Sequence, residues 1–207
     1  MKKTLDEILT ETVRVLKDGG LILYPTDTIW GIGCDATDPV AVAKVYALKN
    51  RPDSKSLVLL ADSLDMVARY VHEIPDAAIQ LVEVNDSPMT VIYPGAYAGK
   101  APAPGEKPVA DRHFIAYNAV AEDGSVGIRI PMSDFCRNLC HKLGRPLVST
   151  SANISVTPSP KGYGDIAPEI VSGVDYVVDP SAVPESTGRA SQIIKVELDG
   201  QVTIIRA

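Results

Sequence analysis

Short apolar runs alternate with helical segments along this chain, and that alternation constrains its fold more than any other feature. Apolar residues recur at helical spacing up to the Gly19-Gly20 break, and Asp38-Pro39 begins a second helix that runs to Leu48. A third helix is predicted from Asp134 to Leu143, where Gly144 ends it. The apolar runs have the length of strands and cover residues 21–24, 57–60, 89–93, 126–130, 147–148, 192–196 and 202–206. The last two flank Asp199-Gly200, a hairpin signal. The pattern predicts an α/β protein with a mixed sheet.

The size of the chain favours one domain. Its 207 residues, 45% of them hydrophobic, can bury one sizeable core, so we expect a single domain over residues 1–207. Residues 94–108 are rich in Pro, Gly and Ala without periodicity. We expect them to form an exposed loop that moves or closes over a ligand.

Charge and cysteine usage exclude several classes of protein. Twenty basic residues against 26 acidic ones give a net charge of −6, which disfavours sequence-independent binding to nucleic acid but allows a local basic cleft. Three cysteines without CxxC spacing indicate neither a disulfide framework nor a zinc site. The N-terminus has no apolar signal core and no stretch is long enough to span a bilayer, so we expect a cytoplasmic protein without membrane contact.

Two predicted strands end in polar loops of similar design. Residues 146–160 read PLVSTSANISVTPSP, and residues 24–35 read YPTDTIWGIGCD. Composition alone favours loops that satisfy only their own backbone. Because α/β sheets bind ligands beyond the carboxyl ends of their strands, two such loops can instead converge on one pocket for a polar, phosphate-bearing ligand. Neither loop matches GxxxxGK[ST] or GxGxxG.

Three groups of basic residues suggest anion binding. Lys49, Arg51 and Lys55 follow a predicted helix, where cations also offset the negative end of the helix dipole. Arg129 interrupts an apolar strand, and a buried arginine is costly unless an acid or a bound anion neutralises it. Arg206 lies near the last residue and is either a frayed end or an anion ligand.

Five ordered motifs resemble the YrdC-like family of threonylcarbamoyl-AMP synthases. They are PTDTIWGIGCDAT, LKNRPDSKSL, SPMT, GIRIP and PLVSTSAN, and together they extend over almost the whole chain. The resemblance implies a twisted sheet with a concave, positive cleft in a single-domain form. It also implies a nucleotidyltransferase that makes threonylcarbamoyl-AMP and pyrophosphate from L-threonine, bicarbonate and ATP.

The family pattern also implies roles for individual residues. Threonine would lie near Thr26 or Thr28, Arg129, Ser149 and Ser191. The catalytic cations would be Lys49 and Arg51, with magnesium brought by ATP and no protein-ligated metal. The residues implied to bind ATP are Lys49, Arg51, Lys55, Thr90, Ser125, Ser151, Asn153, Ser159 and Arg206.

Departures from the family pattern and an alternative function accompany this resemblance. Ser87 stands before Pro88 where the family commonly has glycine, and Ile154-Ser155 continues a loop where glycine is common.

The resemblance also implies partners: the product would serve tRNA threonylcarbamoyladenosine modification through a separate transferase, with tRNA or other RNA as a further contact. The alternative is an RNA-binding module without synthase activity, and it is disfavoured because only eleven Phe, Tyr and Trp residues are available for base stacking. The three histidines match no motif and are interpreted as structural or surface residues.

Overall fold

The computed structural model describes residues 3–50, 57–155, 157–182 and 186–207. Within them, nine strands form one mixed sheet in the order β7-β1-β2-β6-β3-β5-β4-β8-β9. The pairs β1–β7, β3–β5 and β4–β8 are parallel, and the other neighbours are antiparallel. The strands are β1 (Ile22–Tyr24), β2 (Gly31–Gly33), β3 (Val58–Leu60), β4 (Met89–Tyr93), β5 (Val126–Arg129), β6 (Leu147–Ser151), β7 (Tyr176–Val177), β8 (Gln192–Val196) and β9 (Val202–Arg206).

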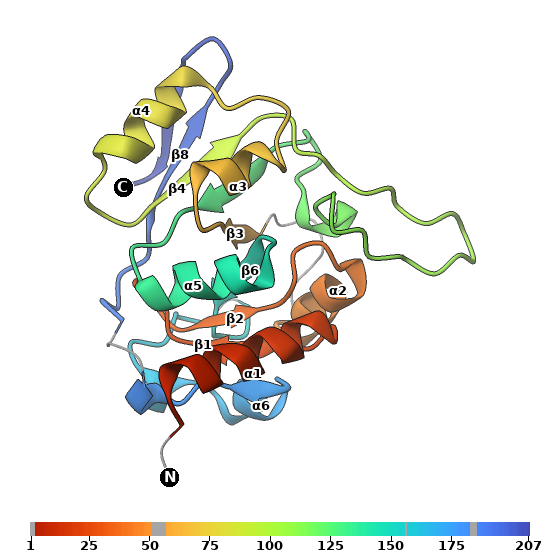
Figure 1. Ribbon diagram of the computed structural model, residues 1–207, viewed down its shortest axis with the longest axis vertical. Coiled ribbons are helices and arrows are strands. Elements are labelled where there is room, and N and C mark those ends of the chain that lie inside the picture. Colours follow the sequence, from red (N-terminus) through yellow and green to blue (C-terminus); the bar gives the residue numbers. More distant parts are fainter. Residues whose placement is uncertain (1–2, 51–56, 156, 183–185) are drawn as a thin grey trace.

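Six α-helices of the described residues flank this sheet (Figure 1). They are α1 (Leu5–Lys17), α2 (Pro39–Leu48), α3 (Leu64–Ala68), α4 (Asp76–Val84), α5 (Asp134–Leu143) and α6 (Pro168–Ser172). Local chemistry sets their ends. Thr4 and Glu7 form a capping box before α1, Asp38 caps α2, and Gly144 ends α5 in the left-handed conformation at φ 74°.

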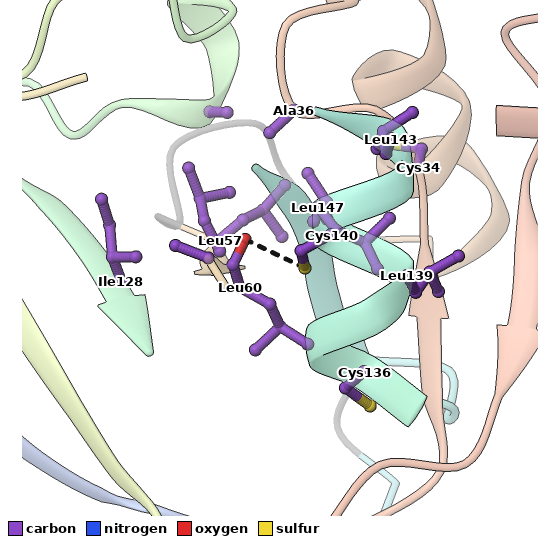
Figure 2. Packing of buried hydrophobic residues seen from close by; sticks show 14 of the residues in the cluster. Cys34, Ala36, Leu57, Leu60, Ile128, Cys136, Leu139, Cys140, Leu143 and Leu147 are labelled. Carbon is purple, nitrogen blue, oxygen red and sulfur yellow. Dashed lines mark hydrogen bonds between the residues drawn. The ribbon is translucent and has the colours of Figure 1, made fainter. Parts of the chain in front are cut away.

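Helices α1 and α5 lie side by side against the sheet (Figure 1). The inner face of α5 carries Cys136, Leu139, Cys140 and Leu143, all of which are buried (Figure 2). The Cys140 thiol lies 3.6 Å from the Leu60 carbonyl oxygen on β3. The core therefore extends without interruption from these helices to the central strands, consistent with the expected single domain.

Residues 95–115 project from the body of the molecule as an arm (Figure 1). The base of the arm is held by backbone hydrogen bonds from Tyr97 to the Tyr70 carbonyl at 2.9 Å and from Gly99 to the Ile115 carbonyl at 2.7 Å. The arm contains most of the segment that the sequence predicts to be an exposed loop, and that exposure is confirmed.

The sequence predicts the fold class and most of the elements. The α/β class with a mixed sheet is confirmed, and β4, β8, β9 and α5 have the predicted bounds. Strands β2 and β7 and helices α3, α4 and α6 were not predicted. None of the described helices has both the length and the apolar character needed to cross a membrane.

Candidate functional site

Two polar loops converge on one cavity of about 280 Å³. One loop follows β1 and supplies Thr26 and Thr28. The other polar segment begins in the last residues of β6, from Ser149 to Ser151, and continues into the loop after that strand. Register brings them together, because Gly31 of β2 pairs with Ser151, and Ser149 pairs with Val58 of β3. The convergence of these loops, predicted from the sequence, is therefore present in the structure. The volume is near the lower end of the range for small-ligand pockets, about 300–1,000 Å³.

The loop after β1 is held by its own hydroxyl groups. The Thr26 Oγ1 donates to the Ile29 carbonyl at 2.7 Å and accepts the Thr28 amide at 3.1 Å. It also lies 2.8 Å from the Thr28 Oγ1. Because the single Thr26 proton points to Ile29, the Thr28 hydroxyl donates to Thr26 and keeps its lone pairs for other donors. Thr26 is therefore occupied in shaping the loop, and Thr28 has the greater capacity to accept from a partner in the cavity.

Arg129 places a buried guanidinium at the floor of the cavity. Its side chain is 4% exposed and forms an ion pair with Asp27, whose side chain is 10% exposed. The Nη2 atom lies 3.3 Å from the Thr28 Oγ1. The second carboxylate oxygen of Asp27 accepts the Met132 amide at 3.0 Å. Of the two partners that the sequence left open for Arg129, the structure contains the acid, and the remaining N–H groups can still donate to an anion.

Residues 186–191 run along the loop after β1 and lead into the cavity wall. The Ser186 hydroxyl donates to the Thr26 carbonyl at 2.7 Å, the Thr187 hydroxyl to the Asp27 carbonyl at 3.0 Å, and the Gly188 amide to the Thr28 carbonyl at 2.7 Å. Ala190 and Ser191 then line the cavity. This segment therefore fixes the backbone of the loop after β1.

Ser191 connects two further residues of the predicted site. Its hydroxyl lies 2.8 Å from that of Thr90, which is fully buried behind it on β4. Its carbonyl accepts both Nε and Nη2 of Arg206, at 2.9 and 2.7 Å. Burial lowers the pKa of the Arg206 guanidinium. Arg206 thus lies against the cavity wall with a defined orientation and is not a frayed end.

Lys49 connects the end of α2 to the loop after β6. The residue is only 2% exposed, and its Nζ donates to the Ser151 carbonyl and, at 2.5 Å, to the Asn153 carbonyl. The side chain therefore stabilises the loop after β6. The helix-dipole interpretation of Lys49 requires only an exposed cation near the end of a helix, so it does not account for this burial and these hydrogen bonds. The Asn153 amide nitrogen donates to the Ile154 and Thr157 carbonyls, which closes the loop on itself.

One of the two glycines of β2, Gly33, makes room for the buried ring of Tyr24. A Cβ on Gly33 would lie 2.8 Å from the Tyr24 Cε1 atom and 3.0 Å from the Val148 carbonyl. A Cβ on Gly31 would meet the same ring carbon at 3.4 Å, an ordinary contact. Strand packing therefore explains the glycine at position 33, whereas Gly31 borders the cavity and has room for a Cβ.

Not all of the sequence-predicted residues line this cavity. Those that line it are Thr26, Thr28, Arg129, Ser149, Ser151, Ser159, Ser191 and Arg206. Thr90 lies behind Ser191, and Lys49 and Asn153 support the adjoining loop. The Ser125 hydroxyl, near the other end of β5 from Arg129, donates to Asp123 at 2.6 Å, and Ser125 does not border the cavity. Arg51 and Lys55 lie outside the described residues.

The lining is polar and cationic. It contains two arginines and six hydroxyl residues from the predicted set, and the residues described there include no carboxylate and no aromatic ring. The three histidines do not border it: His72 packs on Tyr97, His141 lies 3.0 Å from Asp62, and His113 is in the arm. Across the described residues, no group of three or more His, Cys, Asp or Glu is arranged to hold a metal ion. The arrangement can therefore bind carboxylate or phosphate oxygens and a hydroxyl-bearing ligand.

Sequence reasoning missed Asp27 and residues 186–188. Asp27 stands within the first motif, but its partner Arg129 is 102 residues away, and nothing local marks the pair. A buried arginine predicted in a strand is a signal to search for an acid near the cavity, and the acids of the polar loops are the first candidates. Residues 186–188 bind through backbone and short hydroxyl groups and leave no pattern in the sequence.

Comparisons with known proteins find similar sequences over most of this chain. The model of the Sua5, YciO and YrdC family, described as telomere recombination, matches residues 14–207. A threonylcarbamoyl-AMP synthase of Xanthomonas euvesicatoria is 32% identical over 179 residues, which is 86% of this chain and 88% of that protein. A threonylcarbamoyl-AMP synthase of Saccharophagus degradans is 33% identical over 145 residues, 70% of this chain and 68% of that protein.

Solved structures show the same fold. Sua5 of P. abyssi, crystallised with L-threonine, superposes with a TM-score of 0.77 at 23% identity over 100% of this chain. This chain spans only 55% of that longer protein. YciO of E. coli superposes with a TM-score of 0.75 at 20% identity, covering 99% of this chain and 90% of that one.

Proposed function

This chain belongs to the Sua5, YciO and YrdC family, and on that premise we propose that it is a threonylcarbamoyl-AMP synthase. The curated relatives that match most of its length carry that name. The observation that supports the proposal best is the convergence of Arg129 and two hydroxyl-bearing loops on one cavity. Such a cavity suits a ligand that carries a carboxylate, a hydroxyl and phosphates together.

The proposed reaction needs no nucleophile from the protein. The amine of L-threonine takes up the carbon of bicarbonate as a carbamate, with loss of water. A carbamate oxygen then attacks the α-phosphorus of ATP, the bond from that phosphorus to the bridging oxygen breaks, and pyrophosphate leaves with the bond electrons. Negative charge builds on oxygens throughout, so catalysis depends on positioning and on cations.

The amino acid would be bound at the Arg129 side of the cavity. The free N–H groups of Arg129 can donate to the threonine carboxylate, and the pair with Asp27 fixes their direction. Thr28, Ser149 and Ser191 supply hydroxyls within the same lining. Thr26 would act indirectly, because its hydrogen bonds hold the loop that carries Thr28.

ATP would be bound on the side of Ser151, Ser159 and Arg206. Arg206 is oriented by Ser191, and Lys49 holds the loop of Ser151 and Asn153. We assign Arg51 and Lys55 to the phosphates on the family pattern alone. The magnesium ion would arrive with ATP and offset charge on its phosphates. Ser125 and Thr90 would act through the strands that carry them.

The product would be consumed by a separate tRNA threonylcarbamoyl transferase, and contact with tRNA would be transient. The alternative from the sequence, an RNA-binding module without catalysis, is less well supported. The described lining offers no aromatic side chain on which a base can stack, and the curated relatives are synthases.

Pyrophosphate release tests the proposal. We expect release only when L-threonine, bicarbonate and Mg·ATP are all present, with loss of the signal when any one is omitted. Thr28→Val should raise the threonine concentration needed for half-maximal release, whereas Thr10→Val, which alters an exposed residue of α1 outside the lining, serves as the matched control. ATP turnover that is independent of threonine would refute the assignment.

A further inference from the structure

A second cavity, of about 550 Å³, lies away from the candidate site and is lined by basic side chains. Lys17, Arg69, Arg112 and Arg145 border it, with His113 and the buried Tyr70. None of these residues belongs to the lining of the cavity around Arg129. We call this cavity the basic hollow.

The cations of the basic hollow come from four separate segments of the chain. Lys17 is the last residue of α1, Arg69 follows α3, Arg112 belongs to the arm, and Arg145 follows α5. The carbonyl ends of α1, α3 and α5 account for one cation each, because Lys and Arg offset the negative end of a helix. Arg112 lies on no helix, so helix ends do not explain the whole cluster.

The positive charge of the basic hollow is only partly neutralised. Arg145 forms an ion pair with the buried Asp35. Among the described residues, the side chains of Lys17, Arg69 and Arg112 have no carboxylate partner within 4 Å. Asp111 is close in sequence to Arg112, but its carboxylate accepts the His113 amide at 3.0 Å. Unpaired cations gathered in a hollow of a protein with net charge −6 are an unusual local concentration.

Tyr70 fixes two parts of the hollow relative to each other. Its hydroxyl donates to the Arg112 carbonyl at 2.7 Å, and its carbonyl accepts the Tyr97 amide at 2.9 Å. Burial raises the pKa of the Tyr70 phenol; the Arg69 guanidinium acts against that rise, the Asp35 carboxylate adds to it, and Arg145 and Arg112 act against it. The arm is therefore tied to the body at the point where it contributes Arg112 to the hollow.

We propose that the basic hollow is a second anion-binding site that takes a compact polyphosphate, such as inorganic pyrophosphate or the phosphates of a nucleotide. One arginine can donate two parallel hydrogen bonds to the oxygens of a phosphate, so three arginines around one hollow suit a ligand with several linked phosphates. A compact ligand fits better than an extended backbone, because the cations surround a hollow and do not form a stripe. The site is independent of the proposed synthase activity.

Backbone-amide NMR with pyrophosphate as the probe tests this proposal. In a magnesium-free titration, we expect saturable shifts at the amides of Arg69, Arg112, His113 and Gly144. Pyrophosphate that binds near Arg129 would shift a different set, including Thr28 and Ser151, so the two sites are read separately. An oligoribonucleotide without terminal phosphate, titrated in parallel, separates a compact polyphosphate from a nucleic-acid backbone.

The variant R69Q/R112Q should weaken pyrophosphate binding at the hollow by about tenfold or more, because two charge-assisted contacts are lost. Both side chains are exposed, so the fold should be retained, and the single variants provide the same comparison if it is not. The control R137Q/K195Q removes the same charge elsewhere and should leave binding at the hollow unchanged. Absence of shifts at the hollow, equal weakening by both double variants, or shifts with the oligoribonucleotide alone would each overturn the proposal.

Discussion

Arg129 and Asp27 form a buried ion pair across 102 residues of sequence, at the floor of the candidate site. The carboxylate of Asp27 also accepts the Met132 amide at 3.0 Å. The pair therefore joins the loop after β1 to the end of β5, and it holds one guanidinium at the cavity without leaving an uncompensated charge. This relationship makes the stability of the protein and the binding of an anion depend on the same residue.

Removing one member of this pair should destabilise the protein. Arg129→Met leaves the Asp27 carboxylate buried without its partner, and such changes cost about 3–5 kcal/mol. The double variant Asp27→Asn with Arg129→Met should regain most of that loss, because no charge remains buried. Urea unfolding of wild type, both single variants and the double variant measures the coupling.

The double variant also separates stability from binding. If it is folded, it should still require far more threonine than the wild type, since the guanidinium that binds the carboxylate is absent. A double variant with normal dependence on threonine would show that Arg129 is only structural. Single variants as stable as the wild type would show that the pair is not buried in solution.

Lys49 should matter for stability more than its place after a helix suggests. Lys49→Met leaves the Ser151 and Asn153 carbonyls without this donor, and loss of charge-assisted hydrogen bonds costs about 1.5–3 kcal/mol. Lys44→Met on the same helix is the matched control, because Lys44 is exposed and bonds to the Gly19 carbonyl at 2.8 Å. Thermal unfolding compares the two variants. Equal, small effects would favour the helix-dipole interpretation of Lys49.

How far the sequence predicts this structure depends on what each residue shows locally. Strand β4 and helix α5 were predicted with their bounds because apolar runs and caps such as Gly144 are local signals. Strand β2 was missed because Gly31 and Gly33 carry no side chains to reveal an alternating pattern. The convergence of the polar loops could be predicted because both follow strands. The ion pair of Arg129 could not be predicted, because it depends on the order of strands in the sheet.

The two glycines of β2 should differ sharply in their tolerance of alanine. Gly33→Ala would place a Cβ 2.8 Å from the Tyr24 ring and 3.0 Å from a carbonyl oxygen, so we expect a loss of about 1–3 kcal/mol from overpacking. Gly31→Ala meets its neighbours at 3.4 Å or more and should change stability little, although it borders the cavity. Chemical denaturation of both variants decides between these expectations, and a Gly31→Ala variant as unstable as Gly33→Ala would contradict them.

The three cysteines should be unreactive in the folded protein. Figure 2 shows Cys34, Cys136 and Cys140 within the hydrophobic packing around α5. Burial raises the pKa of the Cys136 thiol to about 12 and raises those of Cys34 and Cys140 well above the ordinary value. The raised pKa keeps each thiol protonated at pH 8, and the thiolate is the reactive form. A thiol-specific reagent at that pH should react only at the rate of unfolding, and fast labelling of the folded protein would contradict the buried placement.

Mass spectrometry of the nucleotide formed from Mg·ATP, carbon-13 bicarbonate and each of threonine, serine and valine tests the central claim most directly. We predict a threonylcarbamoyl-AMP that carries the label, a smaller amount of the serine analogue, and almost no valine analogue. A missing methyl group costs about 1–3 kcal/mol, whereas a site that binds the hydroxyl rejects a substrate lacking it by roughly 10⁴-fold. Failure to form a labelled adduct with threonine, or equal use of valine, would contradict the assignment of this cavity to threonylcarbamoyl-AMP synthesis.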